Sequence, residues 1–361
     1  MLVPARAFAV EGGTEDRKTA SAIAIAAGSP SAPDVRCSGT LVAPNVVLTV
    51  RHCVAEVPTP LRTCDVDLGA VSESIKDFWV TAAPWTKDVP WKRVREARVP
   101  QPTKICGNDV ALLVLEEDFD ESEAAVATPV TTSAAFESAA KNRVLGIAAF
   151  GATSITGTDR GTRRSRWDVP IRCVPGDPSF ACGAELDYID VREFTAGNGP
   201  CPGDSGAGAF VPTDRTSVFG ILSRGNLETS CAEGVFVRTD VWAWLIARTV
   251  LDARPGVAPA WATALFPEAP RAGEFCHGAG SCGASAECIS LDGTRSWTCA
   301  DRCSAGACSA DHHCENGLCL PGAPSSAADD GCSAAPGSRV NGAPLVVLAL
   351  VLLATRARKR Q

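Results

Sequence analysis

Hydrophobic residues in the first 240 positions of the chain gather in short runs. Each run has the length of a β-strand and is bounded by Pro, Gly or Asn, and helical periodicity is scarce in this region. The pattern therefore predicts an all-β domain. The clearest strand-length runs cover residues 39–43, 46–50, 110–115, 144–150 and 218–222.

Residues 240–253 depart from this pattern and have the spacing of an amphipathic helix. Asp240 can cap its N-terminus, and the sequence Arg-Pro-Gly at residues 254–256 would end it. We expect a helix that closes the β domain and packs one apolar face against it. That face would carry Val241, Trp242, Leu245 and Ile246.

The composition changes after the predicted helix. Prolines among Ala and Gly favour an extended linker, and the eight cysteines that follow, with few apolar residues, are typical of a small disulfide-rich module. The chain is thus divided into residues 1–9, a domain at 10–253, a linker at 254–273, the module at 274–321, a second linker at 322–342 and an apolar and basic tail at 343–361.

The composition of the whole chain narrows the classes of function. With 45% hydrophobic and 21% charged residues among 361, most of the chain can bury a core. The formal net charge is −7, so the overall field repels polyanions and nucleic acid is not an expected partner. The 17 cysteines stand against a single Met, which indicates an oxidising compartment and hence an exported protein.

Metal binding has to be weighed for His312 and His313, which lie among the cysteines of the module. Oxidised cysteines cannot ligate a metal as thiolates, so disulfides are favoured over a zinc site. Eight cysteines allow many pairings, and none is assigned. We expect no metal and no other cofactor.

The end of the chain has the pattern of a membrane anchor. The lone Cys332 precedes an apolar stretch at 343–355, and Arg and Lys residues follow it. A full span usually needs roughly 17 to 25 residues, but the basic cluster would act as a positive-inside stop. A buried core helix would not end in such a charged cluster. We therefore expect a short C-terminal transmembrane helix.

His52 is the only histidine in the predicted β domain. It follows the apolar run 46–50, so general-base chemistry by an imidazole in this domain would have to use it, at the end of a strand. Asp109 immediately precedes another apolar run and is expected to be half-buried. A buried carboxylate needs a hydrogen-bond partner, and an imidazole N–H is one that also serves function. The alternative for Asp109 is a turn that starts the strand.

Ser205 lies in the glycine-rich segment 199–208. The flanking glycines allow a sharp turn and a close approach of the backbone to a substrate. In a tight turn the backbone N–H groups of Gly203 and Ser205 would converge on an oxyanion. By itself the segment is weak evidence for a nucleophile, because glycine-flanked serines are common in turns.

The three residues in this order resemble the trypsin/chymotrypsin-like (S1) serine endopeptidases: His52 in Thr-Val-Arg-His-Cys, Asp109 in Asn-Asp-Val-Ala-Leu-Leu and Ser205 in Gly-Asp-Ser-Gly. The resemblance covers roughly residues 10–250. It implies two antiparallel β-barrels with the active site between them. It also implies that Ser205 attacks the scissile carbonyl, His52 transfers the proton and Asp109 orients the imidazole, with Gly203 and Ser205 as the oxyanion hole.

The same resemblance assigns further positions. Ser223 would support Asp109 and pair with the substrate backbone, whereas Arg224 stands where a tryptophan is usual. The family pattern also implies three disulfides in the domain and leaves two cysteines for a fourth. The pairs would be Cys37–Cys53, Cys173–Cys182, Cys201–Cys231 and, as the remainder, Cys64–Cys106.

The specificity of such an enzyme depends on the pocket for the P1 residue. Gly199 occupies the position that is acidic in trypsin, and Gly225 and Gly234 would leave the pocket walls open. A basic P1 residue would lack its usual counter-ion unless Glu228 or Glu233 supplied a charge. An apolar or small P1 residue is therefore expected.

Activation in this family uses a new N-terminal ammonium, which pairs with the aspartate before the nucleophile, here Asp204. The matching start is Val10 in Val-Glu-Gly-Gly, and it follows Ala9 rather than Arg or Lys, so trypsin-type self-activation is not implied. Residues 7–9 resemble a signal-peptidase site, but residues 1–6 before them hold no apolar region of the length that a leader needs. Residues 1–9 are interpreted as the rest of a leader that begins upstream, or as a short propeptide.

The tail from Cys332 through the apolar stretch to the basic cluster resembles the MYXO-CTERM sorting signal of myxobacterial surface proteins. This resemblance implies processing near Cys332 by a sorting machinery, with residues 343–355 in the membrane. The protein would be exported and anchored at the cell surface or outer membrane, or released as a secreted form.

Together these features predict a secreted, surface-anchored serine endopeptidase that acts on proteins or peptides. The alternative is a non-catalytic, protease-like binding or adhesion protein, but such proteins lose a triad residue and none is lost here. An esterase or lipase of the α/β-hydrolase type would need a histidine after the nucleophile, and none lies between Ser205 and the linker.

Overall fold

The computed structural model describes residues 10–57, 63–197, 200–226, 231–254 and 259–265, and the shorter pieces 286–290, 297–303, 308, 312–315 and 317–321. Several predictions fall on residues outside these ranges. They concern the leader or propeptide at 1–9, the pocket residue Gly199, the charge at Glu228, the sorting residue Cys332 and the apolar segment 343–355.

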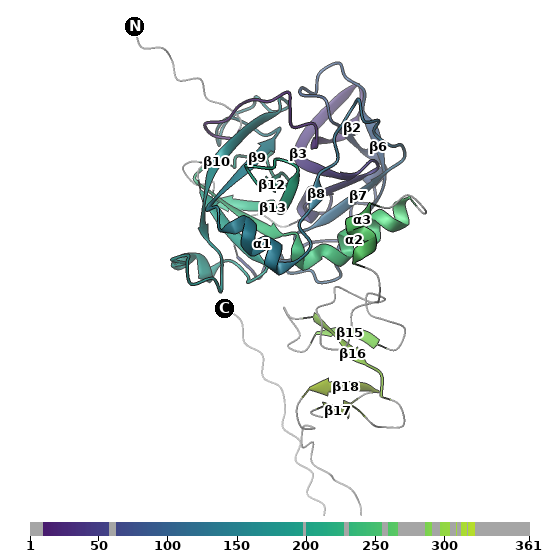
Figure 1. The fold of residues 1–361 in the computed structure, drawn as a ribbon. Coiled ribbons are helices and arrows are strands. Elements are labelled where there is room, and N and C mark those ends of the chain that lie inside the picture. Colours follow the sequence, from purple (N-terminus) through teal and green to yellow (C-terminus); the bar gives the residue numbers. More distant parts are fainter. Residues whose placement is uncertain are drawn as a thin grey trace, which may run out of the picture. The chain divides into compact units, whose positions relative to one another are not determined.

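The first half of the β domain forms a closed antiparallel barrel, seen on the right in Figure 1. The apolar runs 39–43, 46–50 and 110–115 contain most of β3, β4 and β7, whose buried residues pack together in the core of the barrel. The strands are, in barrel order, β2 (Ala22–Ser29), β3 (Ala32–Ala43), β4 (Val46–Thr49), β7 (Ala111–Leu115), β6 (Lys92–Arg98) and β5 (Phe78–Thr81).

The second half forms another closed ring of six antiparallel strands, because β9 pairs with both β10 and β12. Stacked phenylalanines, Phe194 with Phe219 and Phe236, fill its core. The two predicted barrels are therefore confirmed. The ring runs β9 (Val144–Ala149), β10 (Arg164–Cys173), β11 (Glu193–Gly197), β14 (Glu233–Arg238), β13 (Ser217–Asn226) and β12 (Gly208–Phe210), with β1 (Thr14–Glu15) on β10 and β8 (Thr128–Pro129) on β13.

Three helices accompany the barrels: α1 (Ser133–Ala140), α2 (Ala243–Ala253) and α3 (Ala260–Ala264). The helix expected at 240–253 is confirmed as a 3₁₀ turn, η4 (Asp240–Trp242), followed by α2, whose buried face packs on the first barrel. Asp240 is not its N-cap, because its carboxylate binds Arg238 and Ser133 instead. Helix α1 was not anticipated, although Thr132 caps it by accepting the N–H of Ala135.

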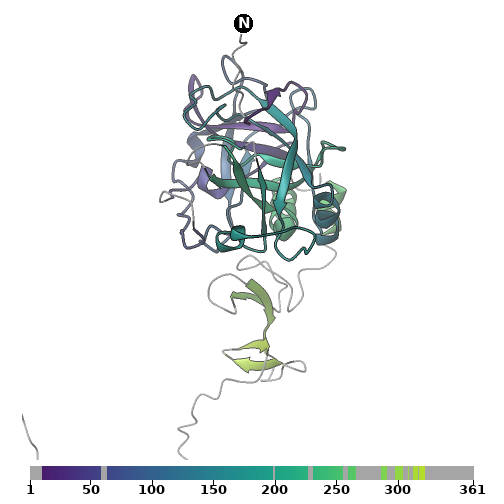
Figure 2. The same cartoon turned by 90° about the vertical axis from the view of Figure 1, so that its left-hand side faces the viewer.

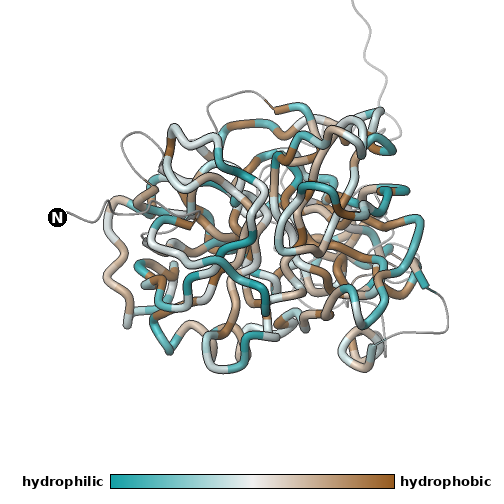
Figure 3. The backbone as a smooth tube through the Cα atoms, turned by 90° about the horizontal axis from the view of Figure 1, so that it is seen from above, coloured by the Kyte–Doolittle hydropathy of each residue, from teal (hydrophilic) through white to brown (hydrophobic). Residues whose placement is uncertain are grey.

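Two further views show the domain from the side and from above. Figure 2 shows the barrels after a quarter turn, and many of the outer loops in Figure 3 are hydrophilic. Other short 3₁₀ turns connect strands. They are η1 (Arg51–Cys53), η2 (Ile75–Asp77) and η3 (Ala184–Asp187).

The cysteine-rich part contains two small hairpins. Among its described residues, the disulfides Cys303–Cys314 and Cys308–Cys319 cross-link it, and Cys299 is also disulfide-bonded. Among the described residues, no helix is both long and apolar enough to cross a bilayer. The hairpins are β15 (Ala286–Ser290) with β16 (Trp297–Asp301), and β17 (His312–Glu315) with β18 (Leu318–Pro321).

Candidate active site

Strand pairing in the first barrel brings His52 and Asp109 together. His52 lies in η1, directly after β4, and Asp109 lies just before β7, and these two strands are antiparallel neighbours with Thr49 opposite Ala111. The His52 Nδ1 atom is 2.7 Å from Asp109 Oδ2, and the His52 backbone N–H donates to Oδ1 at 2.9 Å. The carboxylate thus receives two hydrogen bonds from one residue, which sets the orientation of the ring.

The carboxylate of Asp109 is fully buried, yet its pKa lies below its usual value. Burial by itself raises this pKa, but the charge of the His52 ring and the hydrogen bonds from His52 and Ser223 outweigh it. Ser223 Oγ donates to Asp109 Oδ2 at 2.6 Å. An ionised carboxylate at this place keeps the proton of the imidazole on Nδ1 and leaves Nε2 as the basic nitrogen.

The Ser205 loop is attached to β3, the neighbour of the strand β4 that leads into His52. The Ser38 N–H donates to the Ser205 carbonyl at 2.8 Å, and Ser38 Oγ donates to the Gly203 carbonyl at 3.1 Å. In β3, the neighbouring Cys37 is bonded to Cys53, and the Cys53 sulfur lies 3.9 Å from the Ser205 carbonyl oxygen. The second barrel therefore places Ser205 against β3 and against the disulfide that fixes Cys53, the residue after His52.

Glycine is required at Gly206, directly after Ser205. Its φ is +86°, and a Cβ there would lie 2.1 Å from the Ser38 carbonyl oxygen and 2.1 Å from Thr49 Oγ1. Gly203 has a φ of +95°. In the part of the chain that the structure describes, the N–H groups of Gly203 and Ser205 donate to no protein acceptor. Two free donors on either side of Asp204 are what an oxyanion hole requires.

Asp204 lies behind the Ser205 loop with no exposed surface. Burial raises its pKa to about 7, although the backbone N–H groups of Cys201, Gly151 and Val10 donate to it and lower the pKa. Val10 is itself fully buried in the core of the second barrel and has a φ of +50°. A β-branched residue rarely adopts such a φ, so this backbone is strained. The predicted pair of Val10 and Asp204 is thus brought into direct contact.

Comparison with known proteins agrees with this arrangement. A family model described as Trypsin matches residues 10–245, well over half of the chain. The chain belongs to the trypsin family.

Two individual proteins are similar to this trypsin-family chain. A CLIP domain-containing serine protease HP8 of Bombyx mori is 26% identical over 235 residues, which are 59% of this chain and 61% of that protein. The chain therefore spans about three fifths of that relative's length. A solved structure of human heparin binding protein is 16% identical, with a TM-score of 0.49, and the match covers 69% of this chain and 99% of that chain.

The trypsin-family domain contains the four disulfides expected within it. Each Cα–Cα distance lies between 4.8 and 6.1 Å, as ordinary disulfide geometry requires. The pairs are Cys37–Cys53, Cys64–Cys106, Cys173–Cys182 and Cys201–Cys231. Among the described residues, potential metal ligands gather in two places. One group is Cys37, His52 and Cys53, and the other is Cys303, Cys308 and Cys319. The cysteines of both groups form disulfides and offer no thiolate.

Two of the expected P1 pocket residues face each other in the sheet. Gly225 of β13 pairs with Gly234 of β14, and a Cβ on Gly234 would meet Pro200 and Leu222 side-chain atoms within 3 Å. Glu233, considered as a counter-ion for a basic P1 residue, accepts the Tyr188 hydroxyl at 3.0 Å. Successive residues of a strand point to opposite faces, so Glu233 and Gly234 face away from each other.

The buried partners of Arg224 were missed from the sequence. The guanidinium of Arg224 turns inward and forms an ion pair with Glu193, which has no exposed surface. The one available signal was the charge of Glu193 at the start of an otherwise apolar run, Glu-Phe-Thr-Ala-Gly. Periodicity does not say which cation meets such a charge, because the partner lies in another strand.

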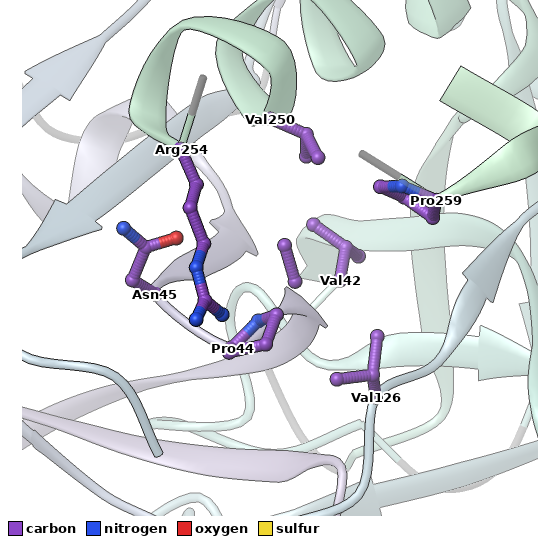
Figure 4. A pocket seen from close by; sticks show the side chains of 8 residues that line it. Val42, Pro44, Asn45, Val126, Val250, Arg254 and Pro259 are labelled. Carbon is purple, nitrogen blue, oxygen red and sulfur yellow. The ribbon is translucent and has the colours of Figure 1, made fainter. Parts of the chain in front are cut away.

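A hollow of about 310 Å³ lies away from these residues (Figure 4). None of the predicted site residues lines it, so it is not part of the candidate active site. Its walls come from the end of β3 and the turn after it, the loop at Val126, helix α2 with the residue after it, and Pro259 just before α3. The lining residues are Val42, Ala43, Pro44, Asn45, Val126, Val250, Arg254 and Pro259.

Proposed function

We propose that this trypsin-family protein is a secreted serine endopeptidase that cleaves peptide bonds through Ser205, His52 and Asp109. The observation that carries the proposal is the 2.7 Å contact between His52 Nδ1 and a fully buried, ionised Asp109. This contact leaves Nε2 of the imidazole as the base. The attachment of the Ser205 loop to β3, close to the Cys37–Cys53 disulfide, supports the same assignment.

The proposed reaction proceeds through an acyl-enzyme. His52 Nε2 takes the Ser205 hydroxyl proton while Oγ bonds to the scissile carbonyl carbon, and the negative charge that develops on the carbonyl oxygen is bound by the N–H groups of Gly203 and Ser205. The imidazolium then protonates the leaving amine as the C–N bond breaks. A water molecule hydrolyses the ester by the same route, which returns the proton to Ser205.

Labelling with a fluorophosphonate probe tests this function. The probe forms a bond to an activated serine, so the chain that begins at Val10 is expected to be labelled, and Ser205→Ala and His52→Ala to lose the label. Ser29→Ala, on the exposed end of β2, is the matched control and keeps it. A folded chain that begins at Val10 and takes no label would favour the alternative, a non-catalytic binding protein.

We propose an apolar or small P1 residue for the substrate. The support is the Gly225–Gly234 pair on the pocket walls and the engagement of Glu233 with Tyr188 rather than with the pocket. A library of peptides that vary only at P1 measures this directly. Cleavage after Lys or Arg at the highest rate would contradict the assignment.

The layout of the remaining chain is also a proposal. Residues 10–253 would form the protease domain, 274–321 a spacer or substrate-docking module, and the tail with Cys332 and residues 343–361 a sorting anchor at the cell surface. Deleting residues 323–361 in the native host should move the protein from the membrane fraction to the medium. Unchanged membrane association of the shortened chain would contradict the anchor.

A further inference from the structure

The turn that carries Asp109 is held by groups from outside the first barrel. Glu193 in β11 accepts the backbone N–H of Gly107 at 2.9 Å, and the indole N–H of Trp242 donates to the Gly107 carbonyl at 2.7 Å. Gly107 has a φ of +73°. Because Gly107 precedes Asp109 by two residues, displacement of Glu193 would displace the carboxylate of Asp109.

Glu193 in turn forms a two-pronged ion pair with Arg224. Arg224 Nη1 is 2.6 Å from Glu193 Oε1, and Nη2 is 3.0 Å from Oε2. The two side chains are 4% and 0% exposed. Burying both charges costs desolvation energy that only good geometry and further hydrogen bonds offset. Those bonds exist here, since Arg224 Nη2 also donates to the Tyr188 carbonyl at 2.7 Å and the Asp190 N–H donates to Glu193 at 2.9 Å.

The same guanidinium reaches the hydroxyl that supports Asp109. Arg224 Nη1 lies 3.4 Å from Ser223 Oγ, and Ser223 Oγ donates to Asp109 Oδ2 at 2.6 Å. With a cationic donor on one side, the hydroxyl hydrogen of Ser223 is directed to the carboxylate on the other. A chain of contacts therefore runs from Glu193 through Arg224 and Ser223 to Asp109.

We propose that Arg224 and Glu193 form a positioning pair for Asp109. Arg224 stands at the position where the family usually has a tryptophan. Glu193 holds the backbone before Asp109, and Arg224 holds the hydroxyl that donates to it. Neither side chain is assigned a contact with substrate. The proposal rests on the proposed function, because it assigns these two residues a role in the same reaction.

The pair is electrically neutral, and this makes the proposal testable by pH. If Arg224 is replaced by an uncharged residue, the negative charge of Glu193 is left uncompensated beside the turn that carries Asp109, the partner of His52. That charge favours the protonated imidazole and moves the acid limb of activity to higher pH. If Glu193 is replaced, the remaining positive charge acts in the opposite direction. Charged and titratable groups around the cluster are His52, Arg51 and Asp109 from the first barrel and Tyr188, Asp190, Arg192, Glu193 and Arg224 from the second.

A second buried ion pair provides the matched control. Arg192 and Asp190 are 2.7 Å apart and bind the same turn, since Arg192 Nη1 donates to Asn108 Oδ1 at 2.8 Å. The structure shows no contact between this pair and Ser223. Removing the Arg192–Asp190 pair loosens the turn but leaves the contact of Arg224 with the Ser223 hydroxyl intact.

The experiment measures kcat/KM against pH for the chain that begins at Val10. We expect Arg224→Met to move the acid limb to higher pH and Glu193→Gln to move it to lower pH, each by roughly half to one pH unit. The double variant should return the acid limb near that of the parent, with a lower kcat because the contacts that position Asp109 are lost. The Asp190→Asn/Arg192→Met control should leave the limb in place. Arg224→Lys keeps the charge but cannot form the two-pronged ion pair with Glu193, so kcat should fall about threefold to tenfold with KM and the acid limb unchanged.

Two readouts separate failure of this inference from failure of the proposed function. The low-field proton resonance of His52 Nδ1 reports the same titration without turnover, in a Ser205→Ala background. A parent that takes no fluorophosphonate label contradicts the proposed function. Folded single variants whose resonances titrate together with the parent overturn the positioning pair. If Arg224→Met does not fold, unchanged kcat in both Arg224→Lys and the double variant overturns it.

Discussion

Asp109 and Asp204 are both fully buried carboxylates at the candidate active site, yet their pKa values move in opposite directions. The pKa of Asp109 lies below its usual value, whereas burial raises that of Asp204 to about 7. Both accept several hydrogen bonds. The difference is the titratable ring of His52 beside Asp109, which supplies a positive charge when protonated. Asp204 instead accepts from the backbone N–H groups of Cys201, Gly151 and Val10, and the charge of Arg160 lowers its pKa by less than these hydrogen bonds do.

The two carboxylates differ in whether a titratable side chain lies beside the buried charge. Hydrogen bonds from neutral groups do not fully replace the solvation of a buried charge, and a cation does. Asp109 already has its partner, the ring of His52, which donates a hydrogen bond when neutral and supplies a positive charge when protonated. We propose that Asp204 is a site for a cation, and that Val10, whose strained N–H is already in contact with it, supplies an ammonium once residues 1–9 are removed.

The largest expected effect comes from removing the charge of Asp109. Asp109→Asn retains the shape but favours the wrong tautomer of His52, so kcat should fall about 10⁴-fold, the magnitude found for this change in serine proteases. Steady-state kinetics with a peptide ester measures the loss, and circular dichroism checks the fold. A folded variant with kcat within tenfold of the parent would remove Asp109 from the mechanism.

The second prediction concerns the dependence of stability on pH. In a chain that keeps residues 1–9, the folded pKa of Asp204 is raised, so its contribution to stability is full below about pH 4 and is lost as the pH rises toward 7, by up to about 4 kcal/mol. A chain that begins at Val10 gains an ion pair over the same range.

Thermal unfolding between pH 4 and 8 compares the two chains. We expect the long chain to become less stable relative to the processed chain as the pH rises, and Asp204→Asn to remove this difference. Parallel curves for the two chains would contradict the assignment of Asp204 as a cation site.

A smaller effect is expected from Gly206→Ala. The new Cβ would collide with the Ser38 carbonyl and Thr49 Oγ1, so we expect a loss of about 2–4 kcal/mol and a displaced Ser205. Gly28→Ala is the control, because Gly28 also has a positive φ, +93°, but nothing lies within 4 Å of its Cβ position. Denaturant unfolding should show a loss of only about 1 kcal/mol for Gly28→Ala. Equal losses would show that backbone strain alone accounts for Gly206.

The smallest effect is expected from Ser223→Ala, which removes one hydrogen bond from Asp109. The pKa of Asp109 is lowered in the fold, so its contribution to stability is present at neutral pH and is lost as the pH falls. Ser223→Ala should reduce stability at pH 7 by about 1–2 kcal/mol and move acid unfolding to higher pH. Acid titration followed by tryptophan fluorescence measures both, and an unchanged acid midpoint would contradict the role of Ser223.

Local pattern was sufficient for much of the site. The strand-length runs predicted the strands on which His52 and Asp109 depend, and the glycines around Ser205 indicated the sharp turn that the structure contains. The helix α1 and the partner of Asp240 were missed. The cap of α1 by Thr132 is local, but one partner of Asp240, Ser133, is distant in sequence.

By itself, therefore, the sequence determined the all-β class, the closing helix and the residues with the chemistry of a serine endopeptidase, because alternation, breakers and residue types are local properties. Only the tertiary structure decided that Glu193 meets Arg224, that Val10 contacts Asp204 and that the two buried aspartates differ. The energy of a buried charge depends on the groups around it in space, and those groups come from separate strands and loops of both barrels.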